Sequence, residues 1–117
     1  MDASLLSRIN AEWLLEHFKY NSKDISAQAS AFFEVARRGL REMERASQLH
    51  DLVGWKFHAG NIKSAAAKIT ARRIAGLCEE AESMLSLSAT DGMALIYHFE
   101  KEMVILKSEI NQLTAAA

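Results

Sequence analysis

The feature that most restricts this chain is the complete absence of proline from 117 residues, with only five glycines. Proline breaks helices and glycine weakens them, so little in the sequence interrupts a helix. Apolar residues recur every three or four positions, which is the period of an amphipathic helix, and neither strand alternation nor an internal repeat is present. The sequence therefore predicts an all-α protein. Its length suits a single domain over residues 1–117 with a sizeable core.

We expect an antiparallel up-and-down four-helix bundle preceded by a short extra helix at the N-terminus. The expected limits are 5–18, 22–46, 51–71, 71–85 and about 90 to the terminal alanines. Side-chain oxygens that can cap a helix start mark several of these limits. The candidate caps are Ser22 or Asp24, Thr70, and Thr90 or Asp91.

The inward faces follow from the same period. In the leading helix the apolar side is expected to hold Leu5, Ile9, Trp13 and Leu14. In the second helix it holds Ile25, Ala29, Phe32, Ala36, Leu40 and Met43, and in the fourth Ile74, Leu77, Cys78, Ala81, Met84 and Leu85. The last helix carries Met93, Ile96, Tyr97, Met103, Val104 and Ile110.

Composition excludes several classes of function. Half of the residues are hydrophobic, a quarter are charged and the net charge is -1, which gives no electrostatic case for nucleic acid or an anionic membrane. No apolar run approaches the roughly 18 residues of a membrane span, and the first residues do not resemble a signal peptide. The single cysteine, Cys78, is expected to be a buried small hydrophobe. These features favour a cytoplasmic protein.

The central segment 51–71 is expected to be a helix with two distinct sides, one packed in the core and one available to a partner. Its core side holds Trp55, Ala59, Ile62, Ala66 and Ile69, which stay within roughly 40° of one line at about 100° per residue. Small or apolar residues gather on the opposite side, with lysines at the edges. That side holds Val53, Phe57, Gly60, Ser64 and Ala67, flanked by Lys56 and Lys63. Such a face suits an acidic protein partner, although a helix buried on both sides would show the same pattern.

No conventional catalytic or metal site is visible in the sequence. The glycines are scattered and form no phosphate-binding loop. None of the histidines has a second histidine or a cysteine at metal-ligand spacing, so we expect neither a metal nor a cofactor. They are His17, His50, His58 and His98. Glu79, Glu80 and Glu82 suggest a solvated helix edge, and Ser64 has no nearby histidine to activate it.

The segment "AGNIKSAAAKITARRIAGLCEEAE", residues 59–82, resembles the signature of histidine-containing phosphotransfer (HPt) domains. The positions that fit are Ile62, Lys63, Ser64, Ala65, Ala66, Ile74, Leu77, Cys78 and Glu82. Upstream positions fit the same register: Phe32, Glu34, Ala36, Leu40, Ala46, Asp51 and Trp55. The resemblance covers most of the chain and implies that the expected bundle is the fold of this family.

The chain departs from the family at its reactive position. In the HPt register the phosphate-accepting histidine falls on Gly60, and a family glycine falls on Thr70. The resemblance implies that Lys63 would steady a phosphoryl group and that the small Ser64 would leave space for a receiver domain. Gly60, however, has no side chain and cannot act as the nucleophile.

His58 is an alternative phosphate acceptor, but two helix positions are about 200° apart, so it should point away from Gly60. We expect a half-buried, hydrogen-bonded His58 beside Trp55. His50, which lies ten residues before Gly60, could instead cap the break before Asp51.

These observations favour a non-catalytic, HPt-like module of phosphorelay signalling, a monomer or weak homodimer. It would bind a response-regulator receiver domain or a histidine kinase through the face around Gly60. The binding residues would be Val53, Lys56, Phe57, Gly60, Lys63, Ser64 and Ala67. Two alternatives remain. One is an active phosphotransfer protein that uses His58, and the other is a dimerisation or adaptor bundle unrelated to phosphorelay.

Overall fold

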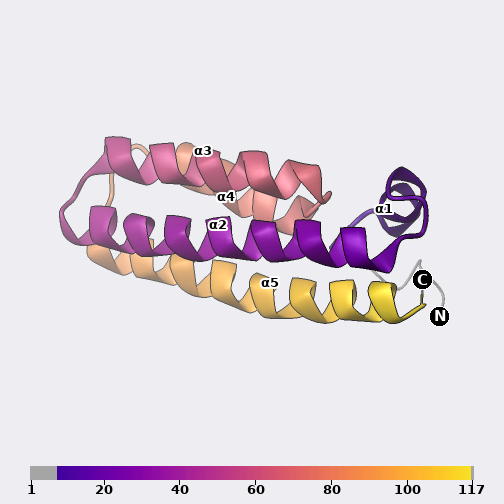
Figure 1. The fold of residues 1–117 in the computed structure, drawn as a ribbon. Helices are drawn as coiled ribbons and strands as arrows, with labels where there is room; N and C mark the ends of the chain where they lie inside the picture. Colours follow the sequence, from indigo (N-terminus) through magenta and orange to yellow (C-terminus); the bar gives the residue numbers. More distant parts are fainter. Residues whose placement is uncertain (1–7, 117) are drawn as a thin grey trace.

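The chain forms an all-helical bundle in the computed structural model, which describes residues 8–116. Five helices and no strands occur in this part: α1 (Ala11–His17), α2 (Ser22–Gln48), α3 (Leu52–Lys68), α4 (Arg72–Glu82) and α5 (Ala89–Ala116). Successive helices from α2 to α5 run in opposite directions, each packs on the next, and α5 returns against α2 (Figure 1). The short α1 lies at one end (Figure 1). The predicted all-α class and bundle packing are confirmed, and none of the described helices is long and apolar enough to cross a membrane.

The core lies between the apolar sides of these helices. All six core residues predicted for α2 are buried, as are all five predicted for the central segment and Cys78. Of the α5 residues named from the sequence, Ile96 and Ile110 are buried and Met103 is partly buried, whereas Met93, Tyr97 and Val104 are exposed. Four further α5 residues complete the core: Leu95, Phe99, Leu106 and Leu113.

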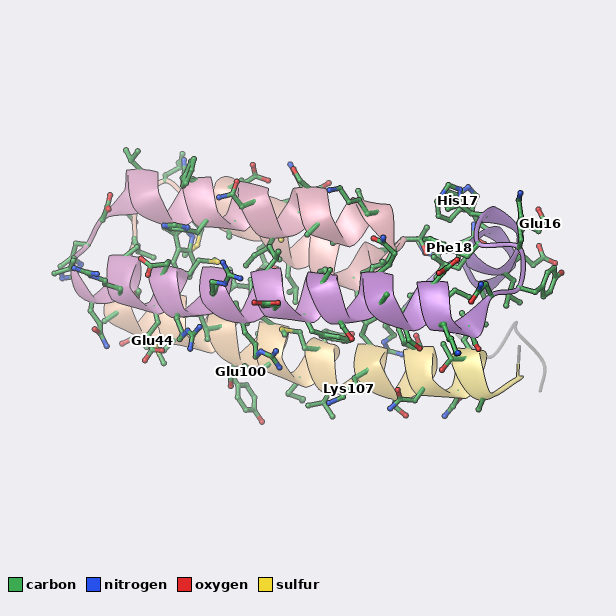
Figure 2. All side chains as sticks on the ribbon, viewed as in Figure 1. Glu16, His17, Phe18, Glu44, Glu100 and Lys107 are labelled. Atoms are coloured by element: carbon green, nitrogen blue, oxygen red, sulfur yellow. The ribbon has the colours of Figure 1, made fainter. Side chains whose placement is uncertain are left out.

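The predicted start of the leading helix was wrong. Helix α1 begins at Ala11, because the Asn10 side chain accepts a hydrogen bond from the Trp13 backbone amide and so caps the first turn. Trp13 is not a core residue, since its ring stacks on that of His17 at 4.4 Å and remains partly exposed. His17 is exposed at this end of the molecule, whereas Phe18 packs partly buried against the core (Figure 2). Leu5 lies outside the described residues.

The predicted caps were also wrong at three helix starts. Asn21 caps α2 by accepting from the amides of Lys23 and Asp24. Ser88, one residue before α5, accepts from the Asp91 amide and takes the role expected of Thr90 or Asp91. In each case the side chain just outside the first helical turn reaches the free amides best.

Thr70 does not cap α4, which begins without a side-chain cap. Its backbone has a left-handed φ of 56°, and its hydroxyl accepts the Asn10 amide at 2.7 Å. The hydroxyl therefore fastens the segment before α1 to the turn between α3 and α4. Arg8 fastens the same segment to α5, because its guanidinium pairs with Glu102 at 3.1 Å and its amide donates to Glu109.

Helix α4 ends at Glu82, three residues earlier than predicted, and this changes the environment of Leu85. Leu85 was expected to face inward, but it is 93% exposed. Once the helix has ended, the helical period no longer determines the direction of a side chain. Leu77 and Met84 are only partly buried against the core. Helix α2, by contrast, extends to Gln48 and shortens the predicted break to 49–51.

Candidate functional site

Helix α3 carries the candidate site and is held firmly on its inner side. Asp51 caps its first turn by accepting the Gly54 amide at 2.9 Å, so the helix begins at Leu52. Trp55 is fully buried, and its indole Nε1–H donates to the Ala81 carbonyl of α4 at 3.2 Å. This bond and the buried apolar side fix the rotation of α3 about its axis. The outward residues are therefore presented in one defined orientation.

The outer side of α3 is the predicted partner face. Val53 is 81% exposed and Phe57 is 62% exposed, while Ser64 and Ala67 are also exposed and Gly60 is half-buried between them. The alternative of a helix buried on both sides is therefore wrong. We call this set, with the half-buried Lys56 and Lys63, the α3 face.

Gly60 lies in the middle of the α3 face and contributes no side chain to it. A Cβ atom at this position would lie 3.7 Å from Glu82 Oε2, an ordinary van der Waals distance. At Gly39, by contrast, a Cβ atom would lie only 2.6 Å from the Ile62 side chain. Gly60 also has no left-handed φ that would demand glycine. A Cβ atom therefore fits at position 60 without moving the backbone.

Lys63 and Glu82 join the α3 face to α4. Lys63 Nζ lies 2.6 Å from Glu82 Oε1, and this bond raises the pKa of Lys63 above its ordinary value. The sequence suggested that Glu82 forms a solvated helix edge with Glu79 and Glu80. The ion pair with Lys63 shows instead that Glu82 is engaged with α3. The pair offsets much of the positive charge of Lys63, which leaves Lys56 as the lysine of the face without an ion pair among the described residues.

The histidines of the chain lie outside the α3 face. His58 is half-buried, as predicted, and its ring meets that of Phe57 edge-on at 5.2 Å. The predicted hydrogen bond of His58 is not formed with any of residues 8–116. His50 lies in the break before α3, where its Nδ1 is 3.1 Å from the Leu87 carbonyl oxygen, so it ties the two loops at this end together. Within the described residues, His, Cys, Asp and Glu form no group of three that could hold a metal.

Cys78 offers no nucleophilic chemistry either. Its side chain is fully buried, and burial raises the pKa of its thiol to about 12. At neutral pH the thiol therefore stays protonated and behaves as a small apolar group.

Sequence reasoning missed two features of the surface. The first is the role of Glu82, which depends on how α3 and α4 lie against each other. The second is a groove between α2 and α5. Its sequence signal was Phe33, which lies seven positions before Leu40 and widens the apolar side of α2 beyond its predicted core positions.

Comparison with known proteins identifies no relative of this chain. The chain matches no known protein family, and no curated protein or solved structure is significantly similar to it.

Proposed function

We propose that this protein is a non-catalytic, HPt-like module that binds a receiver domain through the α3 face. The observation that carries the proposal is the α3 face itself: Val53 and Phe57 are solvent-exposed on a helix whose opposite side is completely buried. Burying a valine or phenylalanine contributes about 1.5–3 kcal/mol, so a partner that covers both gains a substantial part of its binding energy there. The half-exposed Gly60 lets the backbone of a partner approach closely between them.

The proposed mechanism is occupancy of a receiver without phosphoryl transfer. Gly60 supplies no imidazole, and His58 lies about 200° around the helix from it. The resemblance to HPt domains implies that the partner surface is the acidic pocket around a phosphate-accepting aspartate. Lys56 then contributes charge complementarity, which affects the association rate and specificity more than the affinity. A module of this kind competes with active phosphotransfer proteins for the receiver.

Binding to receiver domains from the same organism tests the proposal. Val53→Glu should weaken the complex by about tenfold or more, because it places a carboxylate where the acidic pocket docks. Val104→Glu is the matched control, since Val104 is a similarly exposed valine (71%) on α5, outside the α3 face. Equal affinities of the two folded variants would contradict the proposed surface.

The missing nucleophile provides a second, gain-of-function test. Gly60→His should acquire acid-labile label from a radiolabelled, phosphorylated receiver, because it supplies an imidazole at the HPt position, where a Cβ atom makes only an ordinary contact of 3.7 Å with Glu82 Oε2. Gly76→His is the control, since Gly76 is exposed on α4 and a Cβ atom there meets nothing within 4 Å. A folded Gly60→His protein that binds the receiver and stays unlabelled would refute the geometry.

The same assay separates the alternatives. Label on the wild type that disappears in His58→Gln would identify an active phosphotransfer protein. A tight homodimer that Phe57→Glu dissociates, with no receiver bound, would instead identify a dimerisation module.

A further inference from the structure

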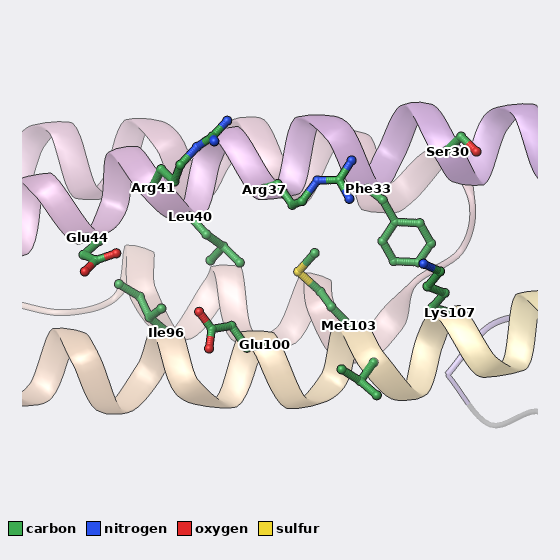
Figure 3. A pocket seen from close by; sticks show the side chains of 11 residues that line it. Ser30, Phe33, Arg37, Leu40, Arg41, Glu44, Ile96, Glu100, Met103 and Lys107 are labelled. Atoms are coloured by element: carbon green, nitrogen blue, oxygen red, sulfur yellow. The ribbon is translucent and has the colours of Figure 1, made fainter.

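The second open surface of the molecule is a groove between α2 and α5, which encloses about 530 Å³. Its floor is apolar and consists of Phe33, Leu40, Ile96, Met103 and Val104. Figure 3 shows four of them, Phe33, Leu40, Ile96 and Met103, between the two helices. Val104, which reaches the solvent from this floor, is 71% exposed. None of these residues belongs to the α3 face.

Charged side chains border the apolar floor and form no ion pairs with one another. Arg37 and Arg41 come from α2, and Lys107 comes from α5. None of the three forms an ion pair with another of residues 8–116. Arg38, the neighbour of Arg37 outside the groove, pairs with Glu34 at 2.8 Å. The groove cations are therefore available to a ligand with negative charge.

The charges of the groove also differ from end to end. Both carboxylates, Glu44 and Glu100, lie toward one end together with Arg41, whereas Lys107 lies toward the other and Arg37 between them (Figure 3). Figure 2 shows Glu44, Glu100 and Lys107 at the surface of the molecule, on the side formed by α2 and α5. A helix carries partial positive charge at its amino end and partial negative charge at its carboxyl end, so this arrangement selects one direction for a bound helix.

The dimensions of the groove favour a helix over a small amphiphile. From Ser30 to Glu44 it extends fourteen positions along α2, or about 21 Å at 1.5 Å per residue. Beyond Ser30 it continues as a shallow hollow lined by Lys23, Asn111 and, for the rest, small side chains: Ser22, Ser26, Ala27, Thr114 and Ala115. An open trough of this length leaves one side of an acyl chain in water. An amphipathic helix keeps its polar side there.

We propose that this groove binds an amphipathic helix of a partner protein. The amino end of that helix lies between Glu44 and Glu100, and carboxylates in its carboxyl half face Arg37 and Lys107. Because the α3 face and the groove share no residue, both can be occupied at once. The protein would then hold two partners together.

A designed peptide tests this proposal. The probe is a fluorescein-labelled helix of about 14 residues, with leucines along one side and glutamates in its carboxyl half flanking them. Its two controls are the reversed sequence, which has the same composition, and a version with lysine in place of glutamate. Fluorescence anisotropy at low salt gives the dissociation constants. We expect the probe to bind about tenfold more tightly than either control.

Variants of the protein locate the site. Arg37→Glu with Arg41→Glu should weaken binding of the probe about tenfold, and Val104→Glu should also weaken it. Arg38→Glu, on the same helix but outside the groove, should leave the affinity within about twofold. Circular dichroism checks that each variant is folded.

Four results would overturn the proposal. They are equal binding of the probe and the lysine version, equal binding of the reversed sequence, equal effects of the groove and Arg38 variants, and binding of dodecanoate without binding of the probe. A fifth result would also overturn it: a homodimer that Val104→Glu dissociates, without peptide binding, would assign the groove to a second copy of the chain.

Discussion

Gly39 sets how closely α2 approaches α3, and replacing it with alanine should destabilise the protein. A Cβ atom at Gly39 would lie 2.6 Å from Ile62 Cγ1 and 2.7 Å from Cδ1. Carbon atoms in contact prefer about 3.5–4.0 Å, so the overlap is about 1 Å. Ile62 is fully buried, and a β-branched side chain in a helix has essentially one χ1 rotamer, so it cannot swing aside. The two helices must therefore separate.

The magnitude follows from two opposing effects. Overpacking a tight core costs about 1–3 kcal/mol. Glycine to alanine within a helix stabilises by about 1 kcal/mol, which offsets part of that cost. Gly76→Ala on α4 experiences only the second effect, because a Cβ atom there meets nothing within 4 Å. The difference in stability between the two variants therefore isolates the overpacking, and Gly39→Ala should be less stable than Gly76→Ala by about 1–3 kcal/mol.

Urea denaturation followed by far-ultraviolet circular dichroism measures this difference, with unchanged m-values as the check that only the native state is affected. A third variant, Gly39→Ala with Ile62→Val, removes the Cδ1 atom and should cost less than the sum of its two single changes. A Gly39→Ala protein as stable as Gly76→Ala would refute the close approach of α2 and α3. Ile62 is on the buried side of α3, opposite Gly60. The same result would therefore also count against the orientation of the α3 face.

Three further predictions concern the same region. Trp55→Phe should destabilise the protein by about 2–4 kcal/mol in urea denaturation, since it leaves a void and removes the buried indole hydrogen bond to the Ala81 carbonyl, and a loss below 1 kcal/mol would contradict that hydrogen bond. Cys78, with a thiol pKa of about 12, should resist a thiol reagent at pH 8 and react fully in guanidinium; rapid labelling of the native protein would show that the site opens. Glu82→Gln should leave the charge of Lys63 uncompensated and speed association with an acidic receiver at low salt in stopped-flow measurements. An unchanged rate would argue against contact between Lys63 and the partner.

The sequence alone determined the helices and most of their inward faces. The absence of proline and the 3.6-residue period are local properties, so they predicted the buried sides of α2 and α3 and the exposed positions of Val53 and Phe57. They also identified Gly60 as the gap in the α3 face. The position of Gly60 in the HPt register remains an inference from sequence resemblance.

Only the tertiary structure decided how residues from different helices meet. The pairing of Lys63 with Glu82, the donation from Trp55 to Ala81 and the groove between α2 and α5 all depend on how neighbouring helices are rotated and spaced. Leu85 is exposed because α4 ends before it, and helix ends depend on caps and on the packing of the next segment. Periodicity describes the direction of a side chain from one helix axis, whereas contacts between helices require the relative positions of two axes.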